Sequence, residues 1–225
     1  MNKRIRLKYR DLPDYTKGEE IFNMTSHIVA ASFSFIGLIL CIVFSVLKHD
    51  LWTGIASTIY GVSLVTSFTI SSIYHGLNPN MGKKVMQVLN HCFVYFVIAG
   101  TYTPILLCAV RPAHPVVAWI LNLLVWALCA MATVFTAIDL EMFDKLSMIC
   151  YIGIGWILIL ALRELYEVLP LAGLLLIIAG GIIYTVGAFV YIKGRTKRYL
   201  HSIFHLFVIT GATFHFIAIF KYIVM

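Results

Sequence analysis

The chain has 225 residues, of which 61% are hydrophobic and only 12% are charged. Soluble domains usually contain about 45–50% apolar and about 25% charged residues. No soluble core of this length needs so much apolar surface, so the composition excludes a soluble protein and indicates a polytopic membrane protein. The formal net charge of +7 is compatible with nucleic acid. Its placement along the chain fits a membrane topology instead, and we expect no nucleic-acid partner.

Residues 1–20 are polar and basic, and an apolar run at 24–47 follows them. This run is longer than the apolar region of a signal peptide, which has about 7–15 residues. We therefore expect a retained spanning helix. The five cysteines all fall inside apolar segments without paired spacing, so they are expected to be small hydrophobic residues and not a disulfide framework.

Six further apolar segments follow, each close to the roughly 20 residues that a bilayer requires. We predict an all-α integral membrane fold, with a cytoplasmic N-terminal segment at 1–23 and a single seven-helix domain at 24–225. The predicted helices are Met24–Leu47, Trp52–His75, Val88–Val110, Val116–Ile138, Leu146–Leu162, Leu169–Ile192 and Leu200–Val224. The short polar connections predict that successive helices pack as antiparallel hairpins.

The distribution of Lys and Arg predicts the orientation, because cytoplasmic loops carry an excess of both. Four lie on one side of the predicted bundle: Lys48, Arg111, Arg163 and Lys221. Thirteen lie on the other: Lys3, Arg4, Arg6, Lys8, Arg10, Lys17, Lys83, Lys84, Lys145, Lys193, Arg195, Lys197 and Arg198. The N-terminus is therefore expected in the cytoplasm and the C-terminus outside it.

Two histidines in the last predicted helix, His201 and His205, are four residues apart and share one helical face. Such a pair can chelate one metal ion. His75 is expected at the same membrane depth, at the cytoplasmic end of the second helix. Three histidines with one open position are typical of a catalytic zinc site, although a lone histidine inside a bundle more often only forms hydrogen bonds.

Other polar residues are predicted at the same face. Ser71 lies one turn from His75, and Asn90 lies near the start of the third helix, so both are candidates to hydrogen-bond a water or ligand at the metal. His91, one residue on, points about 100° away from Asn90 on a helix. We expect His91 to be an interior hydrogen-bonding residue.

The first helix brings Glu20, Asn23 and His27 to this face. Glu20 and Asn23 can simply support the start of the helix, and His27 can hydrogen-bond within the helix or to its neighbours. His215 lies about 15 Å deeper than His205 at 1.5 Å per residue, so it is not expected to share the metal.

Four motifs in chain order carry a family resemblance. They are Glu20-x-x-Asn23-x-x-x-His27, Ser71-x-x-x-His75, Leu89-Asn90-His91 leading to Ala99-Gly-Thr-Tyr-Thr-Pro104, and His201-x-x-x-His205 with His215. Together they resemble the hemolysin III family, the bacterial branch of the progestin and adipoQ receptor group, which is related to alkaline ceramidases. The resemblance implies seven helices, a cytoplasmic N-terminus and a zinc ion near the cytoplasmic face. The histidines that match its ligands are His75, His201 and His205.

The chain departs from the family at Asn90, where an acidic residue is usual. Asparagine can orient a water molecule but cannot take a proton from it. The substitution weakens the expectation of hydrolysis and leaves metal binding unaffected.

Three functions follow from these residues and the resemblance. The first is a zinc protein of the cell membrane that acts in lipid homeostasis by hydrolysing a lipid amide or ester, with membrane lipids or fatty acid as partners. The second is a non-catalytic lipid sensor with structural zinc. The third, a membrane-permeabilising hemolysin, is disfavoured because the polar residues gather at one face and form no stripe across the bilayer.

Two further features concern the helices. Pro104 removes a hydrogen bond within the third helix and is expected to kink it. Gly180, Gly181 and Gly187 are expected to permit close helix packing.

Overall fold

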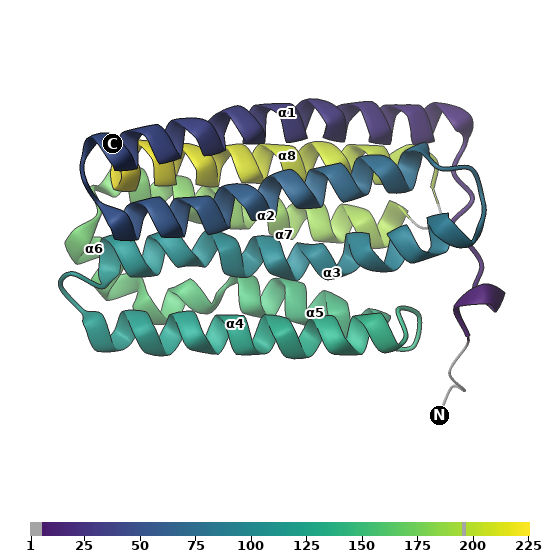
Figure 1. Ribbon diagram of the computed structural model, residues 1–225. Helices are drawn as coiled ribbons and strands as arrows, with labels where there is room; N and C mark the ends of the chain where they lie inside the picture. Colours follow the sequence, from purple (N-terminus) through teal and green to yellow (C-terminus); the bar gives the residue numbers. More distant parts are fainter. Residues whose placement is uncertain (1–5, 195–196) are drawn as a thin grey trace.

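The protein is described here by a computed structural model that covers residues 6–194 and 197–225. These residues form helices and short connections, without a strand. Seven helices are long and apolar enough to cross a membrane, as predicted. They lie side by side in one bundle, with the N-terminal segment at one end and the C-terminus at the other (Figure 1). Of the basic residues used for the orientation, Lys3, Arg4 and Arg195 lie outside the described residues.

The seven spans comprise eight α-helices because the fifth span is broken. A short 3₁₀ helix at Leu7–Tyr9 precedes them. The spans are α1 (Lys17–Leu47), α2 (Leu51–Gly76), α3 (Met81–Pro104) continued by a π-helix (Ile105–Val110), α4 (Pro115–Ile138), α5 (Asp144–Gly155) continued by a 3₁₀ helix (Ile157–Ala161) and α6 (Leu162–Val168), α7 (Leu171–Gly194), and α8 (Leu200–Ile219) continued by a π-helix (Phe220–Val224).

Helix α1 begins seven residues before the predicted Met24, at Lys17. A capping box causes the early start. The Thr16 hydroxyl accepts a hydrogen bond from the Glu19 amide at 3.2 Å, and the Glu19 carboxylate accepts one from the Thr16 amide at 2.9 Å. Both satisfy amide groups that a helix N-terminus otherwise leaves without partners. The polar first turns that hydropathy assigned to a tail are therefore helical.

Helix α3 also begins earlier than predicted, at Met81 instead of Val88. The Asn80 side chain caps it by accepting a hydrogen bond from the Lys83 amide at 2.9 Å. At the other end, Pro104 has no amide hydrogen to donate. The irregularity expected there takes the form of a π-helix that follows the proline.

The fifth span was predicted to end at Leu162, but it continues to Val168. It is interrupted where α5 ends, and the Tyr102 side chain from α3 bonds the interrupted backbone. Its hydroxyl donates to the carbonyls of Ile154 at 2.8 Å and Gly155 at 2.9 Å, and it accepts from the Leu158 amide at 3.0 Å. Backbone groups inside a bilayer must find partners in the protein, and Tyr102 supplies them at this break.

Neighbouring helices pack as the short connections predicted: α1 along α2, α2 along α3, and α7 along α8. Helix α1 also contacts α8, so the first and last spans lie side by side. Glycines permit close approach. A Cβ atom at Gly61 would lie 2.6 Å from the side chain of Leu38, and one at Gly187 would lie 2.8 Å from that of Phe207.

At one end of the bundle, the starts of α1 and α8 lie beside the last turn of α2 (Figure 1).

Candidate metal centre

Three buried histidines meet at that end of the bundle. His75 lies in the last turn of α2, and His201 and His205 occupy the first turns of α8. One ligand nitrogen from each lies within 4.8 Å of the others. Their residues are 3%, 7% and 1% exposed. The structure thus brings together the three histidines that the sequence analysis selected, in an arrangement that can hold a metal ion.

The hydrogen bonds show which nitrogen of each histidine is close to the others. His75 donates from Nδ1 to Glu20 Oε2 at 2.6 Å, because a carboxylate oxygen accepts, so its Nε2 carries the lone pair. That Nε2 has no partner among the described residues. The Nε2 atoms of His201 and His205 face each other at 3.2 Å. Closely spaced buried imidazole nitrogens, one of them on a histidine held by a carboxylate, suit a metal ion.

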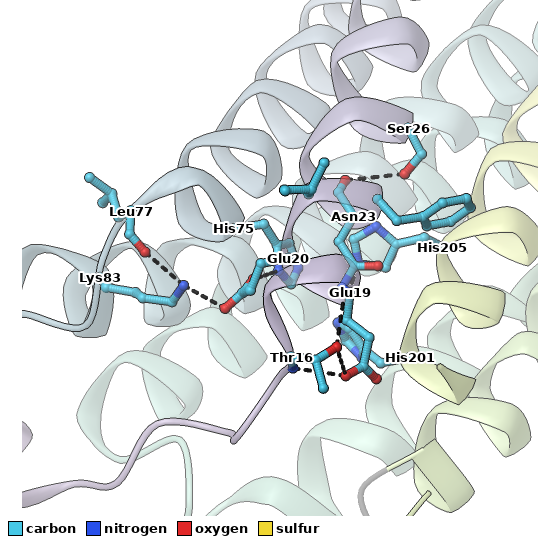
Figure 2. A network of polar contacts seen from close by, with 12 residues as sticks. Thr16, Glu19, Glu20, Asn23, Ser26, His75, Leu77, Lys83, His201 and His205 are labelled. Atoms are coloured by element: carbon cyan, nitrogen blue, oxygen red, sulfur yellow. Dashed lines mark hydrogen bonds and ion pairs between the residues drawn. The ribbon is translucent and has the colours of Figure 1, made fainter. Parts of the chain in front are cut away.

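Glu20 connects this cluster to α3. Its second oxygen, Oε1, accepts a hydrogen bond from Lys83 Nζ at 2.6 Å, and Lys83 also donates to the Leu77 carbonyl at 2.8 Å. Figure 2 shows Glu20 between His75 and Lys83, and the separate contacts of Glu19 with Thr16. The alternative that Glu20 merely supports the helix start is wrong, because Glu19 does so and Glu20 holds a histidine.

Asn23 and His27 form the inner side of the cluster. They are 0% and 5% exposed, and their side-chain nitrogen and oxygen atoms have no hydrogen-bond partner among the described residues. The His27 ring stacks on the His205 ring with 3.9 Å between centroids, and it meets the Phe68 ring edge-on at 5.0 Å. The expectation that His27 hydrogen-bonds within α1 or to a neighbour is therefore wrong: it packs as an aromatic ring.

The two residues selected to position a water line a cavity that reaches the cluster. Ser71 and Asn90 line the same cavity as His201 and His205. The Ser71 hydroxyl is buried and has no partner among the described residues, so it is available to a ligand.

The remaining two motif histidines are interior hydrogen-bonding residues. His91 bonds the Gln87 carbonyl at 2.8 Å and the Tyr191 hydroxyl at 3.2 Å, as expected. His215 is not among the clustered ligands and bonds the Ile177 carbonyl at 3.0 Å.

Two cavities meet at the cluster. The inner one, of about 200 Å³, runs between α2, α3, α5, α7 and α8 and has mostly apolar walls, including those of Leu64, Val97 and Val208. The outer one, of about 540 Å³, has polar walls that include carboxylates of the N-terminal segment and the Lys197 and Arg198 side chains. His91, Tyr191 and His201 line both. The histidines therefore lie where a polar space adjoins an apolar one.

Tyr15, in the segment before α1, covers the cluster from the outer side. Its ring stacks on the His201 ring with 4.8 Å between centroids and lies 5.7 Å from that of His75. Burial raises the pKa of the Tyr15 hydroxyl above its ordinary value, so the group stays protonated at neutral pH. Sequence reasoning missed Tyr15 because it lies in a stretch assigned to a polar tail. Only the Thr16-x-x-Glu19 pattern signals that the helix starts there.

The fold and the cluster define a polytopic helical membrane protein with a buried three-histidine site that can hold a metal ion. A family model described as Haemolysin-III related matches residues 15–216. The chain belongs to this family, which confirms the resemblance.

Curated relatives span almost the whole chain. Hemolysin-3 of Bacillus cereus is 34% identical over 205 residues, covering 91% of this chain and 92% of that protein. The Hemolysin-3 homolog of Bacillus subtilis (strain 168) is 32% identical over 210 residues, covering 93% and 97%. The bacterial relatives indicate that the membrane is the cell membrane.

A human relative supports the connection to the progestin and adipoQ receptor group. The Monocyte to macrophage differentiation factor of Homo sapiens is 28% identical over 185 residues, covering 79% of this chain and 74% of that protein. No solved structure matches the chain.

Proposed function

We propose that the protein is a zinc-dependent hydrolase of a lipid amide or ester bond that acts in membrane lipid homeostasis. One observation carries the proposal: three buried histidines have nitrogens within 4.8 Å of one another, and two of them, His201 and His205, line a cavity with apolar walls. Ionisable groups inside a membrane bundle are costly and usually mark a functional site. The cavity walls suit an acyl chain, and the histidines suit a polar head.

Zinc is the metal that this donor set favours. Three neutral imidazoles with an open fourth position are typical ligands of catalytic zinc. Among the described residues, the group of possible ligands contains these three histidines and no cysteine or carboxylate. A zinc ion bound by His75, His201 and His205 would act as a Lewis acid and would lower the pKa of a bound water molecule to about 7.

The chain's own residues hold and orient the reacting groups. The Glu20 carboxylate keeps the His75 proton on Nδ1, so that Nε2 faces the cluster. The Ser71 hydroxyl is free to hydrogen-bond a water or a carbonyl oxygen, and the Asn90 amide lies in the wall of the same cavity. Asn90 cannot accept a proton, so turnover is expected to be slow.

The two cavities favour an amphiphilic substrate. The acyl chain would occupy the inner cavity and the head group the outer one. The bond between them would lie at the clustered histidines, level with His205, which lines the inner cavity. We further propose that this end of the bundle faces the cytoplasm, since it carries most of the basic residues.

Metal analysis and product analysis together test the proposal. Purified protein should contain about one zinc per chain and release fatty acid from ceramide-like or phospholipid substrates, while His201→Ala should lose both the zinc and the product. His114→Ala is the matched control, because His114 lies at the opposite end and pairs with Glu167. If the zinc-loaded protein releases no metal-dependent product, the hydrolase is excluded.

A second candidate is a non-catalytic lipid sensor in which zinc ties α2 to α8, and Asn90 is the residue that favours it. Chelation should then lower the melting temperature strongly, and Asn90→Asp should create no activity. If the protein is instead a weakened hydrolase, Asn90→Asp should raise fatty acid release, because aspartate can take a proton.

The names of the bacterial relatives raise a third candidate, membrane permeabilisation. The walls of the inner cavity are mostly apolar and unlike those of a water-filled channel. Release of a dye from vesicles that contain the purified protein would support this candidate, and intact vesicles would exclude it.

A further inference from the structure

The inner end of the apolar cavity holds a polar side chain that the proposed function does not use. His215 lines this cavity together with Tyr184 and Trp156, far from the three clustered histidines. Its ring is held by a bond to the Ile177 carbonyl on α7, with Nε2 to oxygen at 3.0 Å. A carbonyl oxygen only accepts, so Nε2 carries the proton, and Nδ1 of the neutral ring is an acceptor.

The His215 Nδ1 atom is buried and has no hydrogen-bond partner among the described residues. An acceptor without a partner costs free energy in an apolar interior, most of all inside a bilayer. A plain alkyl chain in the cavity would leave it without a partner. A ligand that donates one hydrogen bond at this depth would satisfy it.

The surrounding residues hold the ring in place. A Cβ atom at Gly180 would lie 2.4 Å from His215 Cδ2, so only a glycine lets the imidazole lie against α7. The Tyr184 ring packs on His215 with 5.4 Å between centroids, and Gly211 makes room for that tyrosine in turn. The two helices have small residues where the rings need space, so the acceptor has a defined position in the wall.

We infer that this end of the cavity is a second polar subsite, which selects an acyl chain carrying a hydroxyl group partway along its length. The inference rests on the proposed function, because it assumes an acyl chain in the cavity with its head at the clustered histidines. The chain hydroxyl donates to His215 Nδ1, and the Tyr184 phenol, which can both donate and accept, lies beside it in the same wall.

The spacing along α8 sets where the hydroxyl should lie. His205 and His215 are ten residues apart, which is about 15 Å of helix. An extended chain covers about 1.2 Å per bond, so this distance corresponds to roughly twelve bonds. The preferred hydroxyl is therefore near the twelfth carbon from the carboxyl end.

Binding measurements can test the subsite without depending on catalysis or on metal loading. Octadecanoic acid and its hydroxylated forms, with the hydroxyl on the second, the twelfth or the last carbon, would compete with a fluorescent fatty acid for the purified protein. We expect the form hydroxylated on the twelfth carbon to bind about fivefold more tightly than octadecanoic acid, the size of one net hydrogen bond. His215→Leu should abolish this preference and keep the affinity for the plain chain.

His114→Leu serves as the matched control, because it removes a histidine just before α4, at the end of the bundle opposite the cluster, and should keep the preference. Equal binding of plain and hydroxylated chains by the unaltered protein overturns the subsite and leaves the acyl cavity standing. A preference that survives in His215→Leu also overturns it. If no chain binds to the unaltered protein, the acyl cavity and the subsite both fail.

Discussion

Replacing Glu20 tests how the cluster is organised. Its carboxylate bonds His75 Nδ1 and Lys83 Nζ, each at 2.6 Å. Loss of a carboxylate that orients a ligating histidine typically weakens metal affinity by about 10–100-fold, or about 1.4–2.7 kcal/mol. Glu20→Ala should reduce zinc affinity by this factor. Zinc titration of the purified protein against a competing chelator dye measures it.

The same substitution also affects stability, through Lys83. The lysine side chain is 4% exposed and would keep its bond to the Leu77 carbonyl and its contact with the Tyr74 ring. Removing one member of a buried ion pair costs about 3–5 kcal/mol. We expect the lower end, about 3 kcal/mol, because the Glu20 side chain is 19% exposed. The double variant Glu20→Ala with Lys83→Met removes the unpaired charge, so it should recover most of the stability and none of the zinc affinity.

Glu19 offers a matched control one residue away. Its carboxylate bonds the Thr16 amide and hydroxyl and the Tyr199 amide, and it contacts none of the clustered histidines through a hydrogen bond. Glu19→Ala should lower the melting temperature and leave zinc affinity unchanged. Wild-type zinc affinity in the Glu20→Ala, Lys83→Met double variant would refute the role given to Glu20.

Three further substitutions test the scaffold by thermal unfolding. Asp50→Ala removes the cap of α2 and should lower the free energy of unfolding by about 1 kcal/mol. Hydrogen bonds from the Thr53 side chain and from backbone amides of α2 lower the pKa of Asp50, so the cap stabilises the protein above the unfolded pKa of about 3.9. The stability difference between Asp50→Ala and the unaltered protein should therefore vanish as acid protonates Asp50. Gly180→Ala should push the His215 ring off α7 and cost about 1–3 kcal/mol, whereas Gly153→Ala, with no atom within 4 Å, should be neutral. Tyr102→Phe leaves backbone groups of the broken fifth span without partners and should cost about 1–3 kcal/mol, and an unchanged melting temperature would contradict its role.

The histidine cluster could be predicted from the sequence because two of its three members come from one helical face. The i, i+4 spacing places His201 and His205 on one face, and hydropathy alone sets the depth of His75. The direction of each ring could not be predicted. His75 is oriented by Glu20, 55 positions away, and Glu20 by Lys83, 63 positions away. No periodicity in one sequence reveals such pairs.

The starts of α1 and α3 were predicted seven residues too late for a related reason. Hydropathy detects the segment that lies in hydrocarbon, whereas a helix begins where its first amides find partners. At Thr16 and Asn80 those partners are side chains in polar sequence. The Thr16-x-x-Glu19 spacing is that of a capping box, and it is the one signal in the sequence that indicates a helix start before Glu20.

The length of α1 determines how deep the cluster lies in the bilayer. Its 31 residues extend about 46 Å, whereas the hydrocarbon layer is about 30 Å thick and the bilayer with its head groups about 40–45 Å. A helix of this length can reach both head-group layers, with its polar first turns among them. Glu20 lies in those turns beside His75, so under the proposed function the cluster would lie where lipid chains join their head groups, and a bound acyl chain would keep its head at the interface.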